Sequence, residues 1–440
     1  MSNILNLGKD LYIKGRIGWK GLKKEEYLDS GDFKIINATA LEDGYIDWDN
    51  CGFITKERYE ESPEIMLQED DILISKDGTL GKIGYVKNMK TPCSVASGIF
   101  VLRNSSKEKV NFDYLYHLLT SHIFKDFIKR NKAEGSTINH LYQRDLENFE
   151  INLPDLEIQE KVAFVLNSID RKIQNNNKQI QTLESLAKTI YDYWFVQFDF
   201  PNEDGKPYKS SGGKMVWNEE LKREIPAGWE KSFFNQLVSS QVSGDWGKES
   251  IINNHKHQIY CIRGTDFASI NSSENSDIPV RYILEKNLDK RLSYGDIIIE
   301  VSGGSPTQST GRISYITNDL LNRFDKPVLV SNFCKALRLK EPKDVFWFYH
   351  TWSRLYSSGV FFNFESKTTG IKNLMLDPVL TDLGVVIPPV FYREKFYKLV
   401  APFYSRIQKI KSENQQLFSL KVYLLPLLMN GQVKVGKESA

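Results

Sequence analysis

The feature that most constrains the fold is a heptad pattern of apolar residues that occurs twice, over residues 153–195 and 387–429. In both stretches the apolar residues are spaced alternately four and three. A repeat of this kind, held for about five heptads, is typical of a coiled-coil seam, so each stretch requires a partner helix. The seam positions are Val162, Leu166, Ile169, Ile173, Asn176, Ile180 and Leu183 in the first stretch, and Phe403, Ile407, Ile410, Asn414 and Leu417 in the second.

Each seam lies in a helix that we expect to be unusually long. The first helix, at ~1.5 Å per residue, would extend on the order of 55 Å, which favours a spacer. A helical hairpin that only holds two domains together is the simpler alternative, and the second copy makes it less attractive. Pro402 predicts a break near the start of the second helix, and Pro426 predicts its end. Lys421, at a seam position, is expected to bury its stem and keep its ammonium hydrated.

Length and composition limit the class of protein. A chain of 440 residues with 41% hydrophobic and 26% charged residues is typical of a globular protein of two or three domains. Four cysteines without a C-x-x-C pair favour a reducing compartment and argue against structural zinc. No stretch has the length and apolarity of a signal peptide or membrane span, so we expect a cytoplasmic protein that binds no membrane. The net charge of +2 does not by itself indicate nucleic acid.

The two halves of the chain repeat one order of elements. Short β-rich runs lead to an amphipathic helix, a polar turn at residues 135–141 and the first long helix, and a similar series ends at the turn 368–374. Segments 291–299 and 311–316 correspond in sequence pattern to segments 66–74 and 81–86. The predicted boundaries are a first domain at 1–155, a long helix at 156–197, a polar linker at 198–226, a second domain at 227–389, a long helix at 390–430 and a tail at 431–440.

This order carries a family resemblance. A strand-rich domain, the turn Gly-Ser-Thr-Ile-Asn-His-Leu, the run Leu-Pro-Asp-Leu-Glu-Ile-Gln-Glu-Lys-Val and a helix ending in Tyr-Asp-Tyr-Trp-Phe-Val-Gln-Phe precede a second copy of the plan. Together they resemble the specificity (S) subunit of type I restriction-modification enzymes, over nearly the whole chain. The resemblance implies an α+β fold with two similar target-recognition domains joined by two long antiparallel coiled-coil helices, related by a pseudo-twofold internal repeat.

The resemblance also implies a function. Each domain would bind one half of a bipartite, asymmetric site in double-stranded DNA, and the helices would dock two methyltransferase (M) subunits and the restriction/translocase (R) subunits. S-adenosylmethionine and ATP with Mg²⁺ would bind to those partners, and this chain would hold no cofactor. A protein-binding scaffold with two docking domains and no DNA readout is the main alternative, and a hydrolase with an unfamiliar site is a weaker one.

No catalytic motif stands out. The G-x-x-x-x-G-K-[ST] phosphate loop is absent, and segments 78–82 and 244–248 have glycines near a lysine at the wrong spacing. The Asn-Pro-Pro-aromatic run of amino-methyltransferases is also absent. Helix capping explains Asp155 and Glu160 better than nuclease chemistry does. His255 and His257 lack a third metal ligand nearby, so a surface loop is the better interpretation. We therefore predict a non-catalytic subunit.

Candidate DNA contacts lie in two turns and two strand-connecting loops, whose hydroxyl, amide and basic groups suit phosphates and base edges. They are Lys76, Thr79, Lys82, Ser136, Thr137, Asn139 and His140 in the first half, and Ser302, Gln308, Arg312, Lys367, Thr368, Thr369, Lys372 and Asn373 in the second. Simple turn formation and drift of loop sequences remain open as alternatives. The basic cluster at residues 125–132 fits phosphate contacts or, more simply, a solvated helix face.

Overall fold

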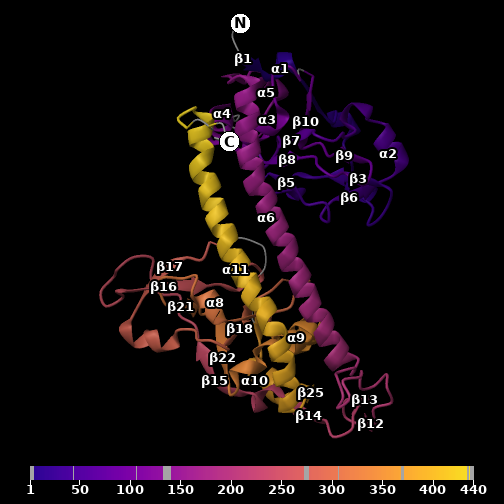
Figure 1. Ribbon diagram of the computed structural model, residues 1–440, viewed down its shortest axis with the longest axis vertical. Helices are drawn as coiled ribbons and strands as arrows, with labels where there is room; N and C mark the ends of the chain where they lie inside the picture. Colours follow the sequence, from indigo (N-terminus) through magenta and orange to yellow (C-terminus); the bar gives the residue numbers. More distant parts are fainter. Residues whose placement is uncertain are drawn as a thin grey trace. The chain divides into compact units, whose positions relative to one another are not determined.

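A computed structural model of the chain describes residues 4–42, 44–105, 107–131, 140–271, 277–305, 307–367, 371–433 and 436. It divides into two compact units: unit 1 comprises Met1–Lys172 and Leu417–Ala440, and unit 2 comprises Ile173–Gln416. Each unit holds one α+β domain together with parts of two long helices, α6 (Leu156–Tyr191) and α11 (Val390–Met429) (Figure 1). No helix among the described residues is long and apolar enough to span a membrane.

The domain of unit 1 is built on two main sheets. A four-stranded sheet has the order β2-β10-β7-β8, a three-stranded sheet has the order β6-β3-β9, and β1 pairs with β11. The strands are β1 (Ile4–Asn6), β2 (Leu11–Gly15), β3 (Phe33–Ile36), β4 (Leu41–Glu42), β5 (Tyr45–Ile46), β6 (Gly52–Ile54), β7 (Ile72–Ser75), β8 (Ile83–Tyr85), β9 (Cys93–Val95), β10 (Ile99–Asn104) and β11 (Glu150–Asn152). The α-helices are α1 (Leu7–Asp10), α2 (Lys56–Glu60), α3 (Phe112–Thr120), α4 (His122–Asn131) and α5 (Gln143–Glu147).

The domain of unit 2 repeats this topology. Its four-stranded sheet has the order β15-β22-β18-β20, its three-stranded sheet the order β17-β16-β21, and β14 pairs with β25. The strands are β12 (Met215–Asn218), β13 (Arg223–Pro226), β14 (Glu230–Phe233), β15 (Val238–Ser243), β16 (His257–Ile262), β17 (Val280–Ile283), β18 (Ile297–Glu300), β19 (Ser302–Gly303), β20 (Ile313–Tyr315), β21 (Val328–Val330), β22 (Cys334–Leu339), β23 (Glu365–Lys367), β24 (Lys372–Leu374) and β25 (Gly384–Ile387). The α-helices are α7 (Phe267–Asn271), α8 (Asn318–Leu321), α9 (Val345–Ser357) and α10 (Leu376–Asp382). The predicted internal repeat is confirmed.

The central strand of each four-stranded sheet is buried on both faces. In β7, Ile72 and Ile74 join the core formed with α3 and α6, while Leu73 joins the core beneath the three-stranded sheet. In β18, Ile297 and Ile299 likewise face one core and Ile298 the other. Successive side chains of a strand point to opposite faces, so a continuous apolar run belongs in such a two-sided position.

Each long helix begins in the same way. In unit 1, Gln159 Nε2 donates a hydrogen bond to the carbonyl oxygen of Pro154 at 2.8 Å. In unit 2, Arg393 Nε donates to the carbonyl oxygen of Pro388 at 2.9 Å. Both side chains are buried, so each hydrogen bond holds the extended segment against the first helical turn. Helix α6 continues as a π-helical turn, η5 (Asp192–Val196).

The two helices pack against each other in opposite directions within each unit. In unit 1, Val162 and Leu166 share a core with Leu428 and Met429. In unit 2, Ile180 shares a core with residues of α11 that include Ile407 and Ile410. Among the predicted seam residues, Val162, Leu166, Ile169, Asn176, Ile180, Ile407, Ile410 and Asn414 are buried, and Ile173, Leu183, Phe403 and Leu417 are half-buried.

The predicted break at Pro402 is wrong, because α11 is continuous from Val390 to Met429. Proline removes the hydrogen bond to the carbonyl of Lys398, but Pro402 and Lys398 are both exposed, so water can satisfy that carbonyl. Buried Val400 and Tyr404 hold the helix in place on either side. Pro426 is also inside the helix, which continues for three further residues because Asn430 N still donates to the Pro426 carbonyl oxygen at 3.0 Å.

The expectation that the ammonium of Lys421 stays hydrated is also wrong. Lys421 Nζ lies 2.6 Å and 2.7 Å from the two carboxylate oxygens of Asp170 on α6. The side chains are 15% and 8% exposed, so this is a mostly buried ion pair. The sequence of α11 alone does not show that the facing turn of α6 supplies a carboxylate.

The polar connector after the first helix is packed in unit 2. Phe198 and Phe200 are buried and lie against Trp229, with ring centroids 5.8 Å and 4.8 Å away. Between them, Asp199 accepts hydrogen bonds from the backbone N and the hydroxyl of Ser210. The connector then forms the β12–β13 hairpin. Aromatic packing and one buried carboxylate fix the conformation of its first residues.

Candidate nucleic-acid interface

In each domain, several strand-connecting loops lie at the same end of the four-stranded sheet. Neighbouring strands are antiparallel, so the ends of β2 and β7 and the starts of β8 and β10 fall on the same side. We call this surface the loop edge. Among the described residues, it consists in unit 1 of residues 16–21, 76–82, 96–99 and 140–141, and in unit 2 of residues 244–248, 301–305, 307–312, 331–334 and 372–374.

The loop edge of unit 1 brings together two segments that the sequence analysis selected independently. Leu141 N donates a hydrogen bond to the Lys76 carbonyl oxygen at 2.9 Å. An antiparallel bridge joins Asp77 to His140, and their side chains are in hydrogen-bond contact through His140 Nδ1 and Asp77 Oδ1. Both side chains are partly exposed, so the pair lies at the surface.

The loop edge of unit 2 has the same backbone arrangement. Leu374 N donates to the Val301 carbonyl oxygen at 2.8 Å, as Leu141 does to Lys76. Ser302 pairs with Asn373 in antiparallel register, and the Ser302 hydroxyl donates to Asn373 Oδ1 at 2.5 Å. The positions of Asp77 and His140 in unit 1 are therefore taken by a hydroxyl and an amide in unit 2.

Lys76 and Lys82 lie at the two ends of one loop in unit 1. Lys76 Nζ lies 4.8 Å from the centroid of the Phe100 ring, and partial burial lowers the pKa of this lysine. The Ser75 hydroxyl donates to the Thr79 carbonyl oxygen at 2.6 Å and accepts from Lys82 N at 2.9 Å. This hydroxyl therefore shapes the loop, with Thr79 exposed at its tip.

Two predicted DNA-binding cations of unit 2, Arg312 and Lys372, are already paired. Arg312 donates to Glu300 twice, through Nε at 2.8 Å and Nη2 at 2.5 Å, and these bonds raise the pKa of Arg312. Glu300 is buried at the position equivalent to Ser75. Lys372 Nζ lies 3.1 Å from Glu365. Gln308 is exposed, and its backbone N donates to the Ser305 hydroxyl at 3.1 Å.

Several of the predicted DNA-binding residues are not part of the described loop edge. Ser136, Thr137, Asn139, Thr368 and Thr369 lie outside the described residues, as does the side chain of Lys367. The basic residues of α4, Lys125, Lys129 and Arg130, are exposed, and Lys132 lies outside the described residues. Among the described residues, no group of three side chains is placed to hold a metal ion.

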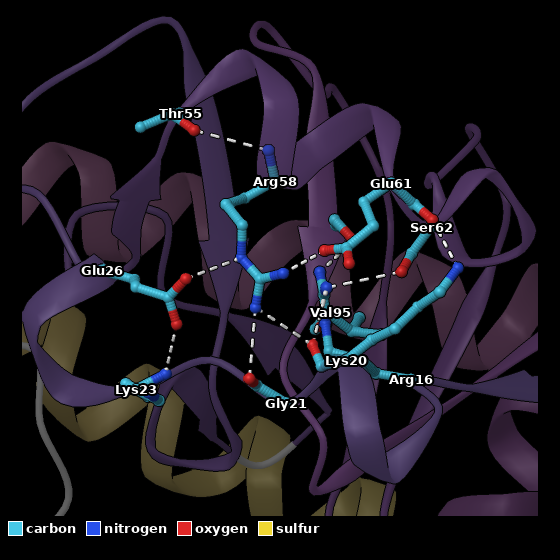
Figure 2. Close-up of polar contacts among 11 residues, drawn as sticks. Arg16, Lys20, Gly21, Lys23, Glu26, Thr55, Arg58, Glu61, Ser62 and Val95 are labelled. Atoms are coloured by element: carbon cyan, nitrogen blue, oxygen red, sulfur yellow. Dashed lines mark hydrogen bonds and ion pairs between the residues drawn. The ribbon is translucent and has the colours of Figure 1, made fainter.

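The sequence analysis selected no residue in the loop after β2, which two arginines hold in place (Figure 2). Arg16 is buried, and its Nε donates to the Val95 carbonyl oxygen at 3.0 Å, while burial lowers its pKa. Arg58 of α2 donates to the Gly21 carbonyl oxygen at 3.1 Å and pairs with Glu26 at 2.9 Å. The available signal in the sequence was the glycine-rich run Gly-Arg-Ile-Gly-Trp-Lys-Gly at residues 15–21.

The equivalent loop of unit 2 uses other contacts. Asp245 N donates to the Val330 carbonyl oxygen at 2.9 Å. In unit 1, the equivalent carbonyl oxygen of Val95 accepts from the guanidinium of Arg16. Arg281 lies over the Trp246 ring, 4.0 Å from its centroid, and pairs with Glu249 at 2.9 Å. A cation therefore fixes this loop in both domains, by different geometry.

Comparisons with known proteins agree with this architecture. Residues 17–185 match the family model described as the type I restriction modification DNA specificity domain. The type I restriction enzyme MjaIX specificity subunit of Methanocaldococcus jannaschii is 26% identical over 388 residues, which cover 84% of this chain and 81% of that protein. The chain is therefore similar to type I specificity subunits over most of its length, and residues 17–185 match the DNA specificity domain model.

Two further relatives extend the comparison. The MjaVIII specificity subunit of the same organism is 24% identical over 386 residues, 84% of this chain and 81% of its own length. The crystal structure of the type I restriction-modification S subunit from M. genitalium is 16% identical and covers 97% of this chain and 95% of that chain, with a TM-score of 0.56. The fold is therefore that of this S subunit.

Proposed function

We propose that this specificity subunit recognises a bipartite, asymmetric DNA site, with one half-site bound at the loop edge of each unit. The observation that carries the proposal is the equivalence of the two loop edges. The Leu141–Lys76 and Leu374–Val301 backbone bonds hold the corresponding segments in the same register. Equivalent backbones with different side chains are what two half-site readers require.

The side chains favour different bases in the two half-sites. Unit 1 presents the Asp77–His140 pair, whereas unit 2 presents Ser302 and Asn373 at the equivalent positions. Amide side chains suit adenine, and carboxylates suit the amino group of cytosine. The two half-sites should therefore differ in sequence, which makes the complete site asymmetric and gives it an orientation.

The long helices support the scaffolding part of the proposal. Along α11 in unit 1, Phe418, Val422 and Tyr423 are 48%, 56% and 67% exposed, and Phe164 of α6 is 66% exposed. Large apolar side chains in this number on a helix mark a protein-binding surface. We assign the surface to methyltransferase subunits, which would carry S-adenosylmethionine, while restriction subunits would carry ATP and Mg²⁺. This chain then contributes recognition and assembly, without a cofactor or a catalytic step.

The test is to express the chain with the methyltransferase encoded beside it, purify both and map methylated bases in the host DNA. We expect one bipartite methylated motif that disappears when this chain is omitted. Exchanging residues 227–389 with those of another specificity subunit should change one half-site and leave the other unchanged. Methylation that does not depend on this chain, together with failure to copurify, would favour a protein scaffold without DNA readout.

A further inference from the structure

One tight turn of the loop edge has different central residues in the two units. In unit 2 the turn connects β21 to β22 and is closed by Cys334 N, which donates to the Ser331 carbonyl oxygen at 2.9 Å. In unit 1 the equivalent turn connects β9 to β10 and is closed by Ile99 N, which donates to the Ala96 carbonyl oxygen at 3.3 Å. The central pairs are Asn332-Phe333 in unit 2 and Ser97-Gly98 in unit 1.

The backbone of Phe333 is fixed in the middle of the loop edge. Its carbonyl oxygen accepts hydrogen bonds from Val301 N at 2.9 Å and Ser302 N at 3.1 Å. Ser302 in turn pairs with Asn373, which places the turn beside two candidate DNA-binding residues. The carbonyl oxygen of Gly98 similarly accepts from Lys76 N at 2.8 Å, so Phe333 and Gly98 occupy equivalent positions.

The side chain of Phe333 has no structural reason to be aromatic. It is 50% exposed, although it follows a strand whose residues Val328–Val330 are buried. The backbone carbonyl of Phe333 contacts Ser302 N, and the Ser302 hydroxyl is hydrogen-bonded to the amide of Asn373. An exposed ring held on a rigid turn among hydrogen-bonding groups resembles a direct reader, because an apolar side chain distinguishes thymine by its 5-methyl group in the major groove.

We propose that Phe333 is a specificity-determining residue of the second half-site and packs against the methyl group of a thymine. This inference rests on the proposed function and adds a residue and a base to it. Gly98 supplies no side chain at the equivalent position of unit 1, so the first half-site lacks this contact. The apolar contact and the amide of Asn373 then lie side by side on one recognition surface.

The experiment uses the full chain coexpressed with its methyltransferase and reads the methylated motif. Phe333→Gly introduces the residue of unit 1. Sites with any of the four bases at one thymine position of the second half-site should then be methylated, with the first half-site unchanged. Phe333→Leu should retain the preference for thymine. Trp217→Ala is the matched control, because Trp217 is 53% exposed on β12, away from the loop edge, and should leave the motif unchanged.

The reciprocal substitution is also available. A Cβ added at Gly98 would lie 3.5 Å from Asp77 Oδ2, an ordinary contact distance, so the backbone at this position accepts a side chain and Gly98→Phe is the variant to make. It should add a preference for thymine to the first half-site. The inference is overturned if Phe333→Gly leaves the motif unchanged or lowers methylation equally at all sites. Failure of the proposed function looks different, because the unmodified chain would then direct no bipartite motif.

Discussion

Asn176 and Asn414 lie 238 residues apart in the chain, and Asn176 Nδ2 donates a hydrogen bond to Asn414 Oδ1 at 2.8 Å between α6 and α11. Both side chains are buried. Asn414 Nδ2 also donates to Asn177 Oδ1 at 2.8 Å. A buried amide pair of this kind aligns two helices, because another register separates the Asn176 donor from the Asn414 acceptor.

Replacing one asparagine should therefore harm the protein more than replacing both. Asn176→Ile leaves Asn414 without its donor and should lower the free energy of unfolding by about 1–3 kcal/mol. The double Asn176→Ile, Asn414→Ile chain should melt above the unmodified protein but form misregistered or oligomeric species. Thermal denaturation and light scattering measure both effects. Unchanged stability and a single species would argue against the alignment role.

The Asp170–Lys421 ion pair should show the same asymmetry. Lys421→Met leaves the Asp170 carboxylate buried without its cation and should lower the free energy of unfolding by roughly 3–5 kcal/mol. Asp170→Leu combined with Lys421→Met removes both charges and should recover most of that loss. Urea unfolding of the three chains gives the comparison. Equal destabilisation by the single and double substitutions would show that the ion pair itself supplies the stability.

Stability should fall in mild acid because of His117. Burial, followed by the charge of Lys421, lowers the pKa of His117 from 6.5 to about 4. The unfolded chain therefore binds a proton at a higher pH than the folded chain does. The free energy of unfolding should decrease as the pH falls from about 6.5 to about 4, by on the order of 3 kcal/mol for this group.

His117→Gln separates this contribution from those of other groups. His117 Nε2 is 2.8 Å from Asn167 Oδ1, and a glutamine amide can keep that hydrogen bond without titrating. Burial also lowers the pKa of His350 to about 3, so this second histidine keeps part of the acid sensitivity. Denaturant unfolding at several pH values should give a shallower pH dependence for His117→Gln. An identical slope in both chains would exclude His117 as a source.

Lys76→Gln should weaken DNA binding without changing the methylated motif. The ammonium lies over the Phe100 ring at the loop edge, where it can contact a phosphate. Loss of one phosphate contact should weaken affinity for all sequences alike and reduce the salt slope by about 1. Binding titrations of the assembled methyltransferase at several salt concentrations measure this slope. A changed motif with an unchanged slope would instead indicate base contact by Lys76.

The apolar surface of α11 should be needed for assembly. Val422→Lys with Tyr423→Lys places charges on two exposed positions, so the fold should persist while copurification with the methyltransferase is lost. Ile251→Lys is the control, because Ile251 is 62% exposed on the domain of unit 2 rather than on a long helix. Equal losses in both chains would indicate a general solubility effect. Normal assembly of the double variant would place the docking surface elsewhere.

The sequence by itself determined the architecture. Heptad spacing predicted both long helices, because a seam of buried residues must recur with the helical period whatever the partner. The duplicated order of strands, turn and helix predicted two domains of one topology. Asn176 and Asn414 could be recognised as polar interruptions of the seams, and the structure places them in direct contact.

Tertiary structure decided which side chains meet. Asp77 and His140 are 63 residues apart, and only the pairing of their segments brings them together. Whether a cation is paired likewise depends on the facing strand or helix, as Glu300 shows for Arg312 and Asp170 for Lys421. Pro402 is tolerated because its face of α11 is exposed. Periodicity is local and can be read along the chain, whereas contacts between distant segments exist only once the sheets and helices have packed.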